Sequence, residues 1–98
     1  MRFRFNTRKL ERLYTEEQGR RRYPDDVVDA FFDVVGAIDS AADERDLYAL
    51  KHLHYEKLKG QRAHQRSLRL AQQFRLVLQR LEDDDGVYLL IETIEDYH

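Results

Sequence analysis

The last residues of the sequence, Asp96-Tyr97-His98, place an acid, an aromatic ring and an imidazole side by side. Histidine is the side chain that titrates nearest neutral pH, so beside a carboxylate and a phenol it is a candidate for proton transfer. The end of a chain usually frays. Here the three residues follow the apolar run Val87 to Ile94, a predicted strand whose pairing would hold them in place. The sequence thus indicates a candidate active site at these residues.

Basic residues are concentrated in one stretch of the chain. Residues 51–80 contain eight basic residues against Glu56 alone, whereas residues 81–98 contain seven acids and no Lys or Arg. Such a concentration is expected of a polyanion-binding surface, although a solvated charged face would give the same pattern. The eight are Lys51, Lys57, Lys59, Arg62, Arg66, Arg69, Arg75 and Arg80.

Length and composition narrow the class of protein. With 98 residues, 42% of them hydrophobic and 37% charged, residues 1–98 are expected to form a single globular domain around one core. The sequence contains no cysteine, so it has neither a disulfide framework nor a thiolate metal site. It also lacks a membrane-spanning apolar run and the apolar stretch of a signal peptide. These features favour a cytoplasmic location and exclude a membrane protein.

The first forty residues predict a strand and two helices. Phe3 and Phe5 alternate with arginines, as in a short strand, and Thr7 can cap a helix that places Leu10 and Leu13 on one side. Pro24 suits the first turn of a second helix. Apolar residues then recur at helical spacing, so this helix should lay one stripe on a sheet. They are Val27, Phe31, Val34, Val35 and Ile38.

The second half predicts strands. After a polar connection over residues 40–46, extended segments are expected over residues 53–58, 67–70, 74–78 and 87–94. Ala71-Gln72-Gln73 is short enough for a hairpin turn, and Asp83-Asp84-Asp85-Gly86 marks a second hairpin more clearly. The predicted fold class is α+β, with a short N-terminal strand and two helices packed on an antiparallel sheet of three or four strands.

Several motifs, in this order and spacing, resemble the HigB ("killer protein") branch of the RelE/ParE toxin superfamily. The resemblance implies a RelE-like toxin of a type II toxin–antitoxin pair that cleaves mRNA in the ribosomal A site without metal or cofactor. It also implies a HigA-like, helix-turn-helix antitoxin, through which operator DNA would be bound. The motifs are Arg2-Phe3-Arg4-Phe5, Tyr55-Glu56-Lys57-Leu58-Lys59-Gly60, Ser67-Leu68-Arg69-Leu70, Gln73-Phe74-Arg75-Leu76 and Glu95-Asp96-Tyr97-His98.

The resemblance also implies roles for single residues. Arg75 matches the strand arginine that meets the scissile phosphate, and Lys59 matches the basic residue of the Leu-Lys-Gly box. The terminal group Asp96, Tyr97 and His98 matches the family's catalytic carboxyl terminus. Two positions depart from the family. Glu56 stands where many members have histidine, so that role is lost or passes to Glu56 or His54, and the turn has Ala71-Gln72-Gln73 instead of Asn-Asp-Gln.

The chemistry can be argued from residue types alone. Metal-free RNA cleavage needs a cation at the phosphate, groups that move protons, and an aromatic platform for an unstacked base. Arg75, Arg69 or Lys59 could bind the phosphate, and His98, Asp96 or Glu56 could move protons. Tyr97 or Tyr55 could stack on a base. The wider RNA-binding set is Lys57, Arg62, Arg66, Arg69 and Tyr55.

Other interpretations remain open at this stage. Arg75 could be a strand residue that pairs with Glu92 across the sheet, and Tyr97 could merely cover the sheet edge. A zinc site built from the four histidines is disfavoured, because only His52 and His54 are closely spaced. The chain could also be a non-enzymatic, ParE-like toxin that inhibits DNA gyrase by protein contact. Finally, the pI of about 6.1 favours a weakly active, degenerate member, since ribosome-directed toxins are commonly basic.

Overall fold

The computed structural model describes residues 1–97. These residues form helices and one mixed sheet, joined by short connections. The chain begins with one strand, continues through three α-helices and ends with four strands. The elements are β1 (Phe3–Phe5), α1 (Arg8–Glu16), the 3-10 turn η1 (Arg20–Arg22), α2 (Asp25–Ser40), α3 (Glu44–Ala49), η2 (Lys51–Leu53), β2 (Glu56–Lys57), η3 (Gly60–Arg62), β3 (Gln65–Arg69), β4 (Phe74–Asp83) and β5 (Gly86–Asp96).

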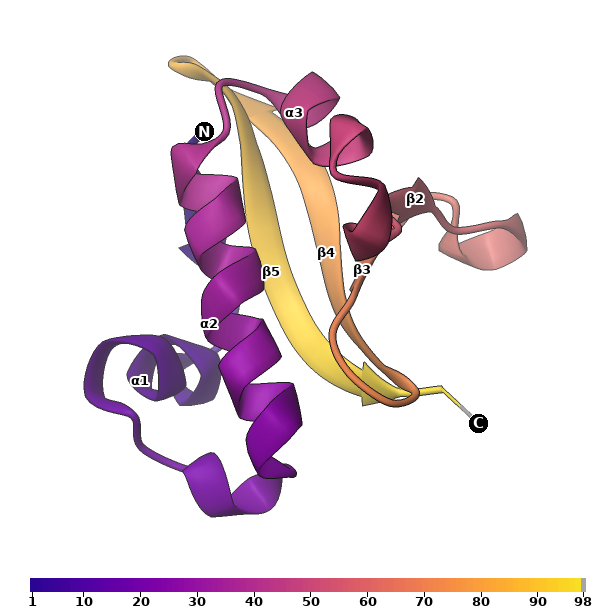
Figure 1. Ribbon diagram of the computed structural model, residues 1–98. Helices are drawn as coiled ribbons and strands as arrows, with labels where there is room; N and C mark the ends of the chain where they lie inside the picture. The colour runs from indigo at the N-terminus through magenta and orange to yellow at the C-terminus, as the bar shows by residue number, and fades with distance from the viewer. Residues whose placement is uncertain (98) are drawn as a thin grey trace.

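The five strands form one sheet in the order β1-β5-β4-β3-β2. Strands β2 to β5 are antiparallel neighbours, whereas β1 lies parallel to the long final strand β5. Helix α2 runs along one face of the sheet, and the segment around β2 and η3 projects away from it (Figure 1). The amino terminus lies near α3, and the end of β5 lies beside the β3–β4 turn at the opposite end of the sheet (Figure 1). The α+β class is confirmed.

Local sequence signals explain the first two helices. The Thr7 hydroxyl accepts a hydrogen bond of 3.3 Å from the Leu10 amide, which satisfies one of the free donors at the start of α1. Pro24 precedes α2, and Asp25 and Asp26 in its first turn complement the helix dipole. Helix α2 buries an apolar stripe against the sheet, as its periodicity predicts. The buried residues are Val27, Val28, Phe31, Val34, Val35 and Ile38.

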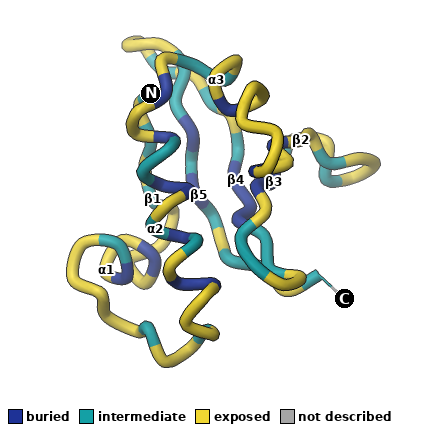
Figure 2. The backbone as a smooth tube through the Cα atoms, in the orientation of Figure 1, coloured by how far each residue is buried: buried dark blue, intermediate teal, exposed yellow. Residues whose placement is uncertain are grey.

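The core lies between α2 and the middle of the sheet (Figure 2). Leu68 of β3, Leu76 and Leu78 of β4, and Leu89 and Ile91 of β5 are all fully buried there. An aromatic cluster attaches β1 and α1 to this core, with ring centroids 5.6 to 6.4 Å apart where Phe5 meets its neighbours. Burial of one such large apolar side chain contributes roughly 1.5–3 kcal/mol to folding. Apolar packing therefore holds the sheet that positions the candidate site.

The connection predicted over residues 40–46 and the strand predicted over residues 53–58 are both partly wrong. Helix α3 begins within the former, with the Asp43 side chain accepting from the Arg45 amide at 2.9 Å. The latter contains only the two-residue strand β2, because η2 precedes it and His54 adopts a left-handed conformation with φ of 48°. The hydrophobic pattern of residues 50–58 comes from packing of Leu53 and Tyr55 against the core instead of from strand alternation.

Both predicted hairpins are confirmed. β4 and β5 are joined at a tip where Asp83 pairs with Gly86, and Gly86 has a φ of 110° that favours glycine. β3 and β4 are joined through the turn that contains Gln72, whose φ is 56°. Between Val77 and Leu78 the pairing with β5 shifts by one residue, so Glu92 is the extra residue of a β-bulge. This bulge lets β5 bend before it reaches the candidate site.

No helix in the described residues is long and apolar enough to cross a membrane.

Candidate active site at the end of the sheet

Strand register brings the key charged residues into one row. Arg75 of β4 lies directly opposite Arg69 of β3 on one side and Glu95 of β5 on the other. Their strand neighbours Leu68 and Leu76 are buried in the core beneath α2. Because successive side chains point to opposite faces of a sheet, the row of charged residues lies on the face away from the helices.

Arg75 is the centre of a group drawn from three parts of the chain. Its guanidinium carbon lies 5.4 Å from the centre of the Tyr97 ring, a cation–π contact. Its Nη1 lies 3.4 Å from the Glu56 carboxylate of β2. That nitrogen is buried and has no hydrogen-bond partner in the described residues. Arg75 therefore has donor capacity left for an anionic ligand.

Arg62 makes a stronger ion pair next to this group. Its Nη1 and Nη2 each donate to one oxygen of Glu95 at 2.8 Å, and its Nε donates to the Gln65 amide oxygen at 2.6 Å. These hydrogen bonds lower the pKa of the Glu95 carboxyl and raise the pKa of Arg62. The pair ties the 3-10 turn η3 to the end of β5. We call Glu56, Arg62, Arg75, Glu95 and Tyr97 together the Arg75 cluster.

Tyr97 is fixed to the sheet beyond the end of β5. Its backbone N–H donates to the Gln73 carbonyl at 2.8 Å, which extends the pairing of Asp96 with Phe74 into the β3–β4 turn. The prediction that strand pairing holds the terminal group in place is therefore confirmed as far as Tyr97. The remaining member of that group, His98, lies outside the described residues.

The other predicted site residues divide into exposed and buried ones. Lys57, Lys59 and Arg69 are exposed, on β2, before η3 and on β3 respectively. Arg69 extends the cationic surface beside Arg75, whereas Lys57 pairs with Arg66 and therefore lies on the opposite face of the sheet. His54 is exposed at the end of η2, but the acid that contacts Arg75 is Glu56. Of the two candidates for the position of the family histidine, Glu56 thus lies at Arg75.

Two members of the predicted RNA-binding set point into a different part of the molecule. Tyr55 is only 6% exposed, and its phenol donates to the Glu44 carboxylate at 2.7 Å, so its ring cannot stack on a base. Arg66 has the strand parity of Leu68, and its Nε lies 3.9 Å from Glu44 on the helix side of the sheet. Both assignments to RNA binding were therefore wrong. A third correction is that Arg75 faces Glu95 and Glu56, not Glu92.

Glu44 at the start of α3 organises a second cluster that the sequence did not predict. Its carboxylate accepts from Tyr55 and forms a 2.7 Å ion pair with Arg80 Nε, and its side chain is only 19% exposed. Burial, together with the hydrogen bond to Glu44, raises the pKa of the Tyr55 phenol. We call Glu44, Tyr55, Arg66 and Arg80 the Glu44 cluster.

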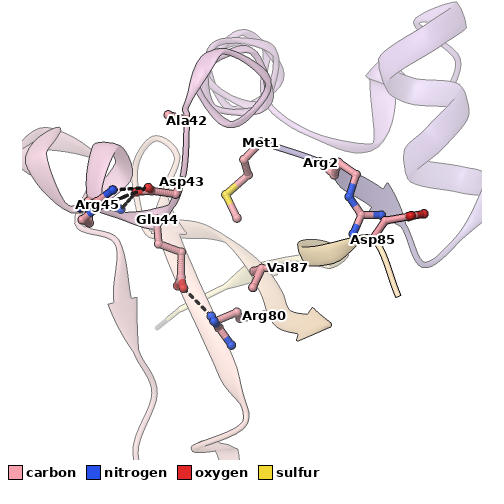
Figure 3. Close-up of a pocket in the computed structure, with 9 residues that line it drawn as sticks. All are labelled: Met1, Arg2, Ala42, Asp43, Glu44, Arg45, Arg80, Asp85 and Val87. Carbon is pink, nitrogen blue, oxygen red and sulfur yellow. Dashed lines mark hydrogen bonds and ion pairs between the residues drawn. The ribbon is translucent and has the colours of Figure 1, made fainter. Parts of the chain in front are cut away.

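The Glu44 cluster borders a cavity of about 600 Å³ that is lined in part by Met1 at the amino terminus. Figure 3 shows the ion pair between Glu44 and Arg80 on one side of this cavity, with Met1 and Val87 beside it. Cations and acids are balanced around it, which is typical of a structural ion-pair network. The lining residues are Met1, Arg2, Ala42, Asp43, Glu44, Arg45, Arg80, Asp85 and Val87.

Comparison with solved structures identifies one that shares this fold. A YoeB/ParE toxin from Agrobacterium tumefaciens superposes with a TM-score of 0.60 at 16% identity, with all of both chains covered. A chain of the toxin–antitoxin complex RelBE2 from Mycobacterium tuberculosis gives a TM-score of 0.49 at 17% identity, covering 98% of this chain and 96% of that one. Comparison with curated protein sequences gives no match. The fold is thus that of the YoeB/ParE-type toxins.

A match to a family model identifies one family within this class of toxins. The model described as the RelE-like toxin of the type II toxin–antitoxin system HigB matches residues 3–98. The chain belongs to this HigB-like toxin family. The resemblance read from the sequence motifs is therefore confirmed.

Proposed function

We propose that this toxin is an endoribonuclease that cleaves mRNA in the A site of the ribosome without a metal ion. The observation that carries the proposal is the convergence on Arg75. A guanidinium with unused donor capacity lies against the Tyr97 ring and 3.4 Å from the Glu56 carboxylate. An arginine, an acid and an aromatic ring are the groups that RNA cleavage by internal attack requires.

The proposed reaction uses the ribose 2'-hydroxyl as the nucleophile. The 2'-oxygen forms a bond to phosphorus as Glu56 takes its proton, and Arg75 stabilises the extra negative charge on the phosphoryl oxygens. The bond from phosphorus to the 5'-oxygen breaks, and that oxygen receives a proton from His98 or Asp96. The products are a 2',3'-cyclic phosphate and a free 5'-hydroxyl. Tyr97 orients the Arg75 guanidinium and offers its ring to a base.

The surrounding cations would hold the RNA backbone. Arg69 is exposed directly opposite Arg75, and Lys59 is exposed three residues after Glu56. They offset the acids of the site, so phosphates can approach despite the acidic residues 81–98. We assign Lys59 to binding of the scissile region, as the family motif implies, with Arg69 binding a flanking phosphate.

The partners follow from the toxin class. We propose that the chain forms a complex with a HigA-like, helix-turn-helix antitoxin in the cytoplasm, and that operator DNA is bound through this antitoxin alone. The ribosome and its mRNA would be the target of the free toxin.

Mapping of new 5' ends tests the activity. The purified chain is incubated with ribosomes that translate a defined mRNA, in parallel with Arg75→Ala and with a chain that lacks His98. We expect cuts within A-site codons for the intact chain and their loss in both variants. Loss in Arg75→Ala alone would remove His98 from the reaction.

A folded intact chain that cuts no mRNA would overturn the proposal. The next assay would then be supercoiling by DNA gyrase, since the fold is shared with a YoeB/ParE toxin. Inhibition of gyrase would establish a non-enzymatic, protein-binding toxin. A chain inactive in both assays would be a degenerate member.

A further inference from the structure

We propose that Arg62 is a positioning residue and not an RNA ligand. Together with Glu95 it clamps the segment between β2 and β3 onto the end of β5, and this clamp holds Tyr97 in contact with Arg75. The inference rests on the proposed function, because Tyr97 and Arg75 belong to the group that would cleave RNA. It also changes the role of Arg62, which its charge and position had assigned to RNA binding.

The hydrogen bonds of Arg62 carry the first step of the argument. All three of its nitrogens already donate, two to the Glu95 carboxylate at 2.8 Å and one to Gln65 at 2.6 Å. A guanidinium binds a carboxylate and a phosphate through the same paired N–H groups. Three of its five N–H groups are engaged, so a phosphate could form the paired contact with Arg62 only by displacing Glu95 or Gln65. The donors of Arg62 are thus already used to hold η3 against β5.

Arg75 differs in each of these respects. Its nearest acid, Glu56, lies 3.4 Å away and leaves Nη1 without a hydrogen bond. Its guanidinium lies over the Tyr97 ring, which orients it without using its donors. The two arginines lie near the same strand end but differ in the N–H groups they have free. Arg75 is the one that can bind a phosphate.

Tyr97 connects the clamp to Arg75. Its amide is bonded to Gln73 in the β3–β4 turn, and its ring contacts the Arg75 guanidinium. On the other side, the Tyr97 phenol contributes to the raised pKa of Arg62, after the larger effect of the Glu95 hydrogen bonds. Glu95 itself is two residues from Tyr97 on the same strand face. The clamp thus supports Tyr97 from a segment of the chain that is remote in sequence.

Three substitutions distinguish a structural role of Arg62 from a role as a cation that attracts RNA. Arg62→Gln removes the cation, Arg62→Lys keeps the charge without the paired N–H groups, and Glu95→Gln removes the acid. If Arg62 bound phosphate, Arg62→Lys would resemble the intact chain, and Glu95→Gln would tighten RNA binding by freeing the cation. The clamp predicts the opposite, a loss of function in all three. Arg45→Gln is the matched control, because it breaks the ion pair with Asp43 near the other end of the sheet.

Two measurements are made on each variant. NMR of the purified chain follows the contact between the Tyr97 ring and the Arg75 side chain and the hydrogen exchange of the Tyr97 amide. Kinetics on ribosome-bound mRNA give kcat and KM. We expect the ring contact to weaken, amide exchange to speed up, and kcat to fall about tenfold with little change in KM, since misplacement of reacting groups acts on the chemical step. Arg45→Gln should match the intact chain in both measurements.

Two results would overturn the clamp. One is an unchanged contact between Tyr97 and Arg75 in both Arg62→Gln and Glu95→Gln. The other is a rise in KM for Arg62→Gln at constant kcat, together with a lower KM for Glu95→Gln. If the intact chain does not cut mRNA, the proposed function fails, and the NMR measurement still decides the clamp by itself.

Discussion

The Glu44 cluster and the Arg75 cluster use the same residue types at opposite ends of one sheet, yet they differ in how closely the central residue is held by its partners. Within residues 1–97 each cluster has one buried arginine nitrogen without a hydrogen bond, Arg66 Nε in the first and Arg75 Nη1 in the second. In the Glu44 cluster one buried carboxylate receives the Tyr55 phenol at 2.7 Å and Arg80 at 2.7 Å. In the Arg75 cluster the central arginine keeps a buried nitrogen without a hydrogen bond, and its acid, Glu56, is 56% exposed.

The difference separates a structural network from a candidate site. A buried carboxylate is tolerated when its partners are close and well aligned, and breaking such a network is costly. An arginine that is 24% exposed and whose acid lies 3.4 Å away is less stabilising but can bind an anion that arrives from solvent. The distance and exposure of the acidic partner, and not the presence of arginine and glutamate, distinguish the two regions.

The largest effect should follow from removal of the carboxylate at the centre of the Glu44 cluster. Glu44→Ala leaves Tyr55 and Arg80 without their shared acceptor in a poorly solvated position. We expect the free energy of unfolding to fall by about 3 kcal/mol. Urea denaturation followed by circular dichroism measures the change.

Glu82→Ala is the control for this prediction. Glu82 contacts the same Arg80, at 3.4 Å, but its side chain is 64% exposed. Its loss should cost less than about 0.5 kcal/mol. Equal costs for the two substitutions would show that burial does not distinguish the Glu44 cluster.

A comparison of two arginines on β4 sharpens the contrast. Arg75→Ala should lower kcat for mRNA cleavage by at least about a hundredfold, the scale seen when one stabilising donor is removed from a transition state. Arg80→Ala should leave kcat per folded molecule unchanged and lower the free energy of unfolding by about 1 kcal/mol. Single-turnover cleavage and urea denaturation on both variants give the four values. The contrast fails if either substitution changes both quantities together.

Glu56→Gln tests the acid of the Arg75 cluster with a smaller expected effect. The substitution keeps the shape of the side chain and removes its ability to take a proton. Because Glu56 is exposed enough for water to replace it in part, we expect kcat to fall about thirtyfold, less than the roughly hundredfold or more that is typical of a general base. His54→Gln, made in parallel, should leave kcat unchanged; a comparable fall in kcat for that variant would assign the base to His54.

The sequence predicts the fold well where the signal is local or periodic. The Thr7 cap, the apolar stripe of α2 and the glycine at the β4–β5 tip each have a physical cause within a few residues. Helix α3 was missed because its six residues bury only Leu47, and so short a helix shows no period.

The sequence predicts the site less well than the fold, because contacts in the site are neither local nor periodic. The Arg62–Glu95 pair joins residues 33 positions apart, and no sequence pattern marks such a contact. The error at Arg66, by contrast, was avoidable. Arg66 shares the parity of buried Leu68, so strand alternation alone places it on the helix side of the sheet. Tyr55 was misassigned because an aromatic residue in a motif looks the same whether its ring is buried or free.

The smallest predicted effect concerns two acids whose charged forms are stabilised by arginines. One acid lies at the β4–β5 tip and the other near the end of β5. At the tip, the hydrogen bond from Arg2 holds the pKa of Asp83 at about 2, and at the other end Arg62 lowers the pKa of Glu95. A lowered pKa stabilises the fold above the unfolded-state value, and this contribution is lost as the pH falls through the folded-state value. The stability difference between the intact chain and Asp83→Asn should therefore shrink as the pH is lowered from about 4 to about 2.

Urea midpoints at pH 5 and pH 2.5 measure this change, with Asp84→Asn as the control. Asp84 is the neighbour of Asp83 and forms no ion pair within residues 1–97. Glu95→Gln should show the same sign of pH dependence, and it should also loosen the contact between Tyr97 and Arg75, whereas Asp83→Asn should leave that contact intact. If Asp83→Asn loosened the contact as well, the two ends of the sheet would be coupled, and the separation of a structural end from a functional end would have to be abandoned.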